Sequence, residues 1–130
     1  MPASPETDAP HSSIAIAAQV LYLVNLLLLP GLAFIALVVL YRMQGNGPDQ
    51  LARLHLRQAL SASLWAGILL VAANGLILLL GGYDGPWVWM VVILYFTIAH
   101  STLIILGMIG LIKAMAGQVW SYPLIGSLLK

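Results

Sequence analysis

Three long, uncharged apolar runs constrain this chain more than any other feature. Asp, Glu, Lys and Arg are absent from Ser13 to Tyr41, from Ala59 to Gly82 and from Trp87 to Ile112. Each run exceeds the roughly 20 residues that a helix needs to cross about 30 Å of hydrocarbon. A water-facing helix would carry a polar stripe, and these runs have none. The sequence therefore predicts an all-α integral membrane protein with three transmembrane helices.

Composition and length limit what such a protein can do. Of its 130 residues only 7% are charged, far below the roughly 25% of soluble domains. We expect a disordered polar leader over residues 1–12 and a single transmembrane domain over residues 13–130. Cysteine is absent, which excludes disulfides and thiolate metal sites. No basic patch is long enough to follow a nucleic acid backbone, so nucleic acid is not an expected partner.

Two breaks in the pattern lie before the second run. Pro30-Gly31 predicts a kink near the middle of span one, because proline removes an amide donor and clashes with the preceding turn. Asn25, one turn earlier, is placed to bond a carbonyl freed by that kink. The Gly- and Pro-rich residues 43–50 predict a tight turn, after which Asp49 can cap a helix. We expect residues 49–58 to form a short interfacial helix that leads into span two.

The basic residues predict an orientation. Arg42, Arg53 and Arg57 fall between spans one and two, while Lys113 and Lys130 follow span three. The positive-inside rule places these segments in the cytoplasm. With three spans, the N-terminus is then expected outside and the C-terminus inside, in a bacterial inner membrane.

Small residues recur at helical spacing in spans two and three. Backbones approach closely over such residues, and this packing drives helix association in lipid. The sequence therefore predicts two helix-packing faces, and it predicts lipids, other membrane helices or a second copy of the chain as partners. The packing positions are Ala59, Ser63 and Gly67 in span two, and Gly107, Gly110, Ala114 and Gly117 in and after span three.

Three polar side chains lie deep in the spans. His100 is the only ionisable group there, and buried ionisable groups in membranes are functional candidates. Depth counting places Asn25, Asn74 and His100 in the same half of the bundle, so they could form one polar cluster. His100 is either a neutral, hydrogen-bonded structural residue, part of a proton or ion path, or an axial ligand of a haem or chlorin. The sequence does not identify a cofactor.

Other chemistry has less support. Arg53, His55 and Arg57 could contact an anionic lipid headgroup or an acidic loop of a partner, or simply form a solvated basic face. No carboxylate lies within a span, so neither paired-acid catalysis nor a carboxylate metal site is supported there. We therefore expect no enzymatic activity.

Two segments resemble a known family. One is Arg53-Leu-His-Leu-Arg-Gln-Ala-Leu60, and the other runs from Gly110 through the Trp-Ser-Tyr-Pro sequence to Ile125. They resemble a small bacterial three- or four-span family that is related to the chloroplast inner-envelope import component and includes the magnetosome proteins MamF and MmsF. The matching positions are His55, Gln58, Ala59, Lys113, Ala114, Gly117, Tyr122 and Pro123.

This resemblance implies modest functional expectations. Most members of the family have no established activity, the magnetosome members influence magnetite crystals, and the plastid relatives belong to an import complex. The loops here carry only Asp49 and Asp84 as acids, which leaves little to bind iron or a crystal face. The leading hypothesis is a non-catalytic accessory or scaffold subunit of a membrane complex or homo-oligomer. The alternatives are a component of a translocation or ion pathway, and a pigment- or haem-binding subunit that uses His100.

Overall fold

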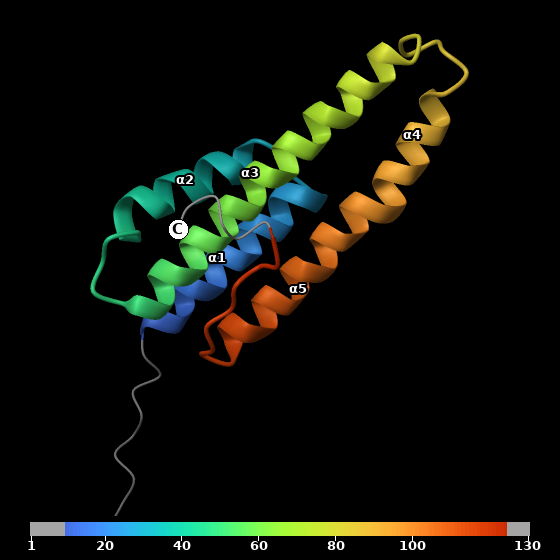
Figure 1. Ribbon diagram of the computed structural model, residues 1–130. Helices are drawn as coiled ribbons and strands as arrows, with labels where there is room; N and C mark the ends of the chain where they lie inside the picture. The colour runs from blue at the N-terminus through green and yellow to red at the C-terminus, as the bar shows by residue number, and fades with distance from the viewer. Residues whose placement is uncertain (1–9, 125–130) are drawn as a thin grey trace, which may run out of the picture.

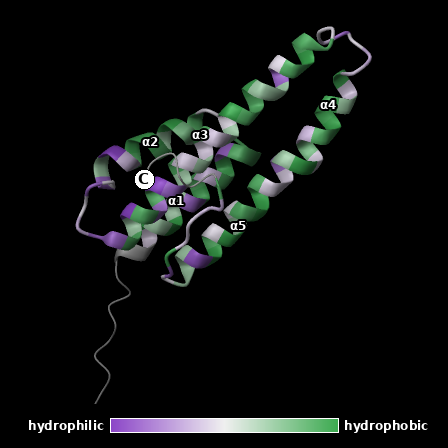
Figure 2. Cartoon of the chain, viewed as in Figure 1, coloured by the Kyte–Doolittle hydropathy of each residue, from purple (hydrophilic) through white to green (hydrophobic). Residues whose placement is uncertain are grey.

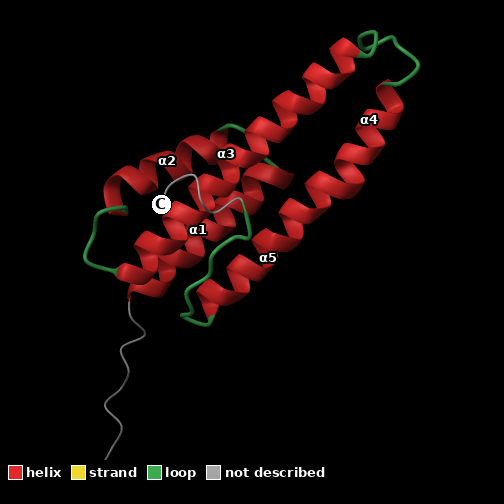
Figure 3. Ribbon diagram, viewed as in Figure 1, coloured by secondary structure: helices red, strands yellow, loops and turns green. Residues whose placement is uncertain are grey.

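The structure is a computed structural model in which residues 10–124 are described, and within them every regular element is a helix (Figure 3). Of the leader predicted over residues 1–12, residues 1–9 lie outside the described residues, as does Lys130, whereas residues 10–12 belong to the first helix. Three elements, α4, η1 and α5, follow one another directly and form one continuous rod (Figure 1). The elements are α1 Pro10–Leu27, α2 Leu32–Gln44, α3 Gln50–Leu79, α4 Val88–Leu94, the π-helix η1 Tyr95–His100 and α5 Ser101–Met115.

The first predicted span is not one helix. The sequence located the break correctly at Pro30-Gly31, but the chain reverses there instead of kinking, so that α1 and α2 pack side by side as a hairpin (Figure 1). Pro30 cannot donate a hydrogen bond to the preceding turn. Gly31 has a φ of +89°, a conformation that other residues rarely adopt. Together they end α1 and allow the reversal.

The backbone of this reversal is satisfied within the hairpin. The amides of Leu28 and Leu29 both donate to the carbonyl of Val24, each at 2.9 Å. The amide of Gly31 donates to Oδ1 of Asn25 at 3.0 Å. Asn25 therefore caps a freed amide, whereas the sequence suggested that it would bond a freed carbonyl. Such pairing is what allows non-helical backbone to lie in an apolar environment.

Among residues 10–124, two helices rather than three are long and apolar enough to cross a membrane. They are α3 and the continuous rod Val88–Met115, while the apolar stretches of α1 and α2, Ser13–Leu27 and Leu32–Gln44, are shorter. The interfacial helix expected at residues 49–58 is the beginning of α3 rather than a separate element. At 1.5 Å per residue α3 is about 45 Å long, so it exceeds the hydrocarbon thickness.

The hairpin packs against only one half of the two long helices (Figure 1). We call residues 67–98, where α3 and the rod continue beyond the hairpin, the arm, and the remaining described residues the base. Polar residues gather in the base, and the arm is almost entirely apolar (Figure 2). Fully buried side chains of the base include Tyr22, Leu37 and Leu56. The arm instead exposes large apolar side chains, such as Val71 at 72% and Leu79 at 86%.

Two contacts shape the turn that joins α2 to α3. Oδ1 of Asp49 accepts from the amide of Leu51 at 3.0 Å, which is the helix cap that the sequence predicted. Nη1 of Arg53 donates to the carbonyl of Gly47 at 2.5 Å. Arg53 is therefore part of the local structure of this turn.

The hairpin leads to a prediction about topology. Because α1 and α2 are antiparallel, the beginning of α1 and the turn between α2 and α3 lie at the same end of the bundle, and the turn between α3 and α4 lies at the opposite end (Figure 1). We expect Ser13→Cys and Asn46→Cys variants to react with an impermeant maleimide from the same side of oriented vesicles, and Asp84→Cys from the other side. The chain has no cysteine of its own. Labelling of Ser13→Cys together with Asp84→Cys would restore the arrangement of three full spans.

Candidate functional site

Four buried polar side chains meet in the base. Gln19 and His55 are fully buried, Tyr122 is 2% exposed and Gln58 is 7% exposed. Gln19 lies on α1, His55 and Gln58 lie on α3, and Tyr122 lies in the segment that follows α5. We call these four residues the base network. Burying so many polar groups is costly unless each one finds a hydrogen-bond partner.

The hydrogen bonds of the base network form a chain in which each side chain donates to the next group. The hydroxyl of Tyr122 donates to Oε1 of Gln19, and Nε2 of Gln19 donates to Nδ1 of His55 at 2.9 Å. Nε2 of His55 in turn donates to the carbonyl of Gln118 at 2.8 Å. Since a carbonyl only accepts, His55 carries its proton on Nε2 and leaves Nδ1 free to accept. Both ring nitrogens of His55 are therefore used in the structure.

Further contacts fasten the segment after α5 to the other helices. Oε1 of Gln58 accepts from the backbone amide of Tyr122 at 2.9 Å. The Tyr122 ring packs edge to face on Tyr22, with centroids 5.5 Å apart. Burial raises the pKa of Tyr122, so its hydroxyl stays protonated as a donor. The hydroxyl of Tyr22 donates to the carbonyl of Leu103 at 3.0 Å, which links α1 to α5.

Two glycines of α5 make this close packing possible. A Cβ added to Gly110 would lie 2.6 Å from Oε1 of Gln19 and 2.8 Å from the hydroxyl of Tyr122. A Cβ added to Gly107 would lie 2.6 Å from the ring of Tyr22. Both distances are far below normal contact, so a side chain at either position would force these neighbours to move. Gly107 and Gly110 of the stripe predicted in span three thus face α1 within the same chain.

The other predicted packing positions have different surroundings. Ala59, Ser63 and Ala114 are buried. Gly67 lies at the start of the arm, and a Cβ added there would meet nothing within 4 Å. Gly117 follows α5 with a φ of +67° and also has open space around it. The span-two stripe is therefore divided between the base and an open face of the arm.

The structure does not bring the three predicted intramembrane polar residues together. Asn25 caps Gly31 in the hairpin. Asn74 lies in the arm, where its Nδ2 donates to the carbonyl of Leu70 at 2.8 Å and its Oδ1 accepts from the hydroxyl of Tyr83 at 2.6 Å. The His100 ring packs near Tyr95 and Phe96 of its own helix. Each residue has local partners, so the depth count did not identify a shared cluster.

His100 ends the π-helical segment η1. Two hydroxyls support this segment, as Ser101 donates to the carbonyl of Phe96 at 2.9 Å and Thr102 to that of Ile98 at 2.6 Å. π-Helical turns within α-helices recur at functional sites. The His100 ring lies 5.2 Å from that of Phe96 and is half-buried. Within residues 10–124 no three His, Cys, Asp or Glu side chains are close enough to hold a metal ion.

The predicted headgroup trio is also separated. Arg53 holds the turn at Gly47. His55 is fully buried in the base network, so it cannot reach a lipid headgroup, and Arg57 is half-buried. These three residues do not form one basic surface.

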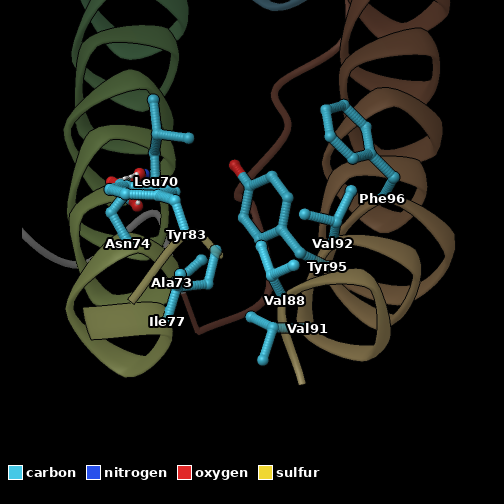
Figure 4. Close-up of a pocket in the computed structure, with 10 residues that line it drawn as sticks. All are labelled: Leu70, Ala73, Asn74, Ile77, Tyr83, Val88, Val91, Val92, Tyr95 and Phe96. Carbon is cyan, nitrogen blue, oxygen red and sulfur yellow. Dashed lines mark hydrogen bonds between the residues drawn. The ribbon is translucent and has the colours of Figure 1, made fainter. Parts of the chain in front are cut away.

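A cavity of about 200 Å³ lies between the two helices of the arm (Figure 4). Its wall is almost wholly hydrocarbon, and the hydrogen-bonded pair of Asn74 and Tyr83 lies along one side. Such a surface can contact an apolar chain but offers little for catalysis. The lining residues are Leu70, Ala73, Asn74, Ile77, Tyr83, Val88, Val91, Val92, Tyr95 and Phe96.

Sequence reasoning missed the base network as a unit. His55, Gln58 and Tyr122 are matching positions of the family resemblance, but the sequence pattern does not predict that His55 and Tyr122 contact Gln19. The available signal was Gln19 itself, a strongly polar amide within an otherwise apolar run. A buried glutamine needs both a donor and an acceptor as partners, and His55 and Tyr122 supply these from residues distant in sequence.

The tight packing at Gly110 gives a prediction for stability. Gly110→Ala forces a methyl group against Gln19 and Tyr122, so we expect a loss of about 1–3 kcal/mol in the free energy of unfolding. Thermal unfolding in detergent, followed by circular dichroism, measures this loss. Gly67→Ala is the matched control, because its methyl group meets open space. An equal effect of both variants would mean that the close approach at Gly110 is not what matters.

The hydroxyl of Tyr122 gives a second prediction. Tyr122→Phe keeps the ring but leaves Oε1 of Gln19 without its donor in the base, at an expected cost of about 1–3 kcal/mol. Hydrogen exchange at residues 118–122 should then rise, because this segment loses an attachment. Tyr83→Phe, in the exposed part of the arm, is the control and should leave exchange at 118–122 unchanged. Unchanged exchange in Tyr122→Phe would show that the segment is held by other contacts.

Comparisons with known proteins complete this picture. No curated protein and no solved structure shows significant similarity to the chain. A family model, however, matches residues 11–129, which covers both the hairpin and the base network. The chain therefore belongs to the MamF/MmsF family, described as the magnetosome magnetite crystal formation protein family.

Proposed function

We propose that this protein is a non-catalytic scaffold subunit of a bacterial membrane, which assembles through its arm with copies of itself or with helices of a larger complex. The observation that carries the proposal is the division of the molecule into two parts. The base is held by buried hydrogen bonds and close packing. The arm has two apolar helices, and much of their surface is not covered by the rest of the chain.

The arm is well suited to helix association. Gly67 and Gly75 both have open space where a Cβ would be, so another helix can approach the α3 backbone closely. Around them Ile68 and Val71 are exposed. In lipid, association is driven by packing rather than by the hydrophobic effect, and small residues beside branched ones favour it. This combination supports the arm as the assembly surface.

A non-catalytic role is supported by how the polar groups are used. His55 commits both ring nitrogens to hydrogen bonds that hold the base together. Asp49 caps α3, and Asp84 is the other acid among the described residues. We infer that the protein affects magnetite formation, the process named for its family, by organising partners in the membrane rather than by binding mineral.

The hairpin modifies the proposed orientation. Arg42, Arg53, Arg57 and Lys113 all lie in the base, and we place this end in the cytoplasm by the positive-inside rule. The N-terminal end of α1 then lies in the cytoplasm as well, and the turn around Asp84 faces the other side. This differs from the orientation expected for three full spans. There a single crossing precedes the turn at residues 45–49, whereas the hairpin of α1 and α2 returns the chain to the side on which it began.

Assembly through the arm is testable with one substitution. We expect Gly67→Leu to weaken self-association or complex formation at least about tenfold, because a leucine holds the helix axes apart and lipid cannot restore the lost contacts. Its fold should persist, since the side chain meets open space within the chain. Mass measurement in mild detergent, by light scattering or native mass spectrometry, reports the assembly state.

His100→Leu is the control for this experiment, and it should retain assembly. A strictly monomeric, partner-free wild-type protein would argue against the scaffold. Loss of assembly in His100→Leu, but not in Gly67→Leu, would favour a ligand at His100. A visible absorption band in the purified protein would support the pigment or haem alternative, and ion flux in liposomes would support the pathway alternative.

A further inference from the structure

A second hollow, open to the molecular surface, lies in the base where the end of α2 meets α3. Its volume is about 530 Å³, and it is formed around the turn that joins the two helices. The lining residues are Val38, Tyr41, Arg42, Gly45, Asn46 and Leu60. We call it the α2–α3 groove. It is separate from the base network and from the arm.

The groove is lined by both polar and apolar residues. Arg42, Tyr41 and Asn46 contribute a guanidinium, a phenol and an amide. Across residues 10–124, no hydrogen bond or ion pair occupies the Arg42 side chain, which is exposed. Val38 and Leu60 form the apolar wall. A fixed cation beside hydrocarbon matches an amphipathic anion.

The turn that carries Asn46 is held in place before any ligand binds. The amide of Gly45 donates to the carbonyl of Tyr41 at 2.7 Å, and that of Gly47 donates to the carbonyl of Gln44 at 3.0 Å. Arg53 then donates to the carbonyl of Gly47. Because Arg53 is already engaged, Arg42 is the cation that remains available to a ligand in the groove.

The charge of this end of the molecule also favours an anion. Four basic residues lie here within the described chain, namely Arg42, Arg53, Arg57 and Lys113, against one acid, Asp49. Basic residues at the end of apolar helices attract anionic lipids, each contributing about 1 kcal/mol near a membrane surface. The neighbouring face of α2 is apolar and exposed at Ile35, Val39 and Met43, so the groove opens onto a surface suited to lipid.

We propose that the α2–α3 groove binds an anionic phospholipid. The phosphate lies on the guanidinium of Arg42, with Tyr41 and Asn46 donating hydrogen bonds, and an acyl chain follows Val38 and Leu60. The apolar wall is what favours a lipid over a soluble phosphate, which would gain nothing from it. This site does not depend on the scaffold role, because it lies in the base and not in the arm.

Native mass spectrometry of the full chain in detergent tests the site with two probes, phosphatidylglycerol and phosphatidylcholine. We expect the wild type to bind phosphatidylglycerol preferentially, and Arg42→Gln to weaken that binding about fivefold while leaving phosphatidylcholine unchanged. Lys113→Gln removes the same charge at the same end of the molecule and serves as the matched control. Circular dichroism confirms that both variants remain folded. Equal losses in the two variants would overturn the proposal in favour of diffuse charge attraction.

The apolar wall is tested by a further variant and a soluble competitor. Val38→Trp fills the groove but keeps Arg42, and we expect it to reduce phosphatidylglycerol binding as well. Inorganic phosphate at millimolar concentration should not displace the lipid. If phosphate displaces it and Val38→Trp binds normally, the ligand is a soluble anion and the lipid site is wrong. Undiminished binding in Arg42→Gln would equally reject the assignment.

Discussion

The hydrogen bonds from Tyr122 through Gln19 and His55 to Gln118 hold three separate parts of this chain together. They join α1, α3 and the segment after α5, and the side chains of Tyr122, Gln19 and His55 are buried at this point, whereas Gln118 lies at the surface. An unpaired polar group in such surroundings is costly, so each of these elements requires the others. Gly110 belongs to the same arrangement, because any side chain there would displace Gln19 and Tyr122. The position of the hairpin against the two long helices follows from these contacts.

The hairpin in turn divides the protein into a base and an arm. The break at Pro30-Gly31 reverses α1 into α2, so both helices cover only one half of α3 and of the rod formed by α4, η1 and α5 (Figure 1). The covered half carries the buried polar groups and the basic residues, and the uncovered half is apolar (Figure 2). The two proposed interactions follow this division, with helix partners at the arm and an anionic lipid at the α2–α3 groove.

Membership of the MamF/MmsF family can be compared with the positions of the residues that resemble the family. The positions that first suggested the family, among them His55, Gln58 and Tyr122, prove to be members of the base network. Their side chains hold the fold and do not form an exposed reactive site. This structural use of its polar residues supports the organising role proposed for the protein.

The sequence by itself determined that this is an all-α protein with long apolar helices, because uncharged runs of that length leave few alternatives. It also located the break at Pro30-Gly31 and the cap at Asp49, since both depend on the backbone chemistry of neighbouring residues. It did not determine that the chain reverses after α1 so that α2 packs against it. A proline kink and a full reversal begin with the same local sequence. Only the tertiary structure decided the partners of Gln19, His55, Asn74 and His100. Hydrophobic pattern and depth counting place a residue along a helix, whereas its partners depend on how the helices rotate and pack against one another.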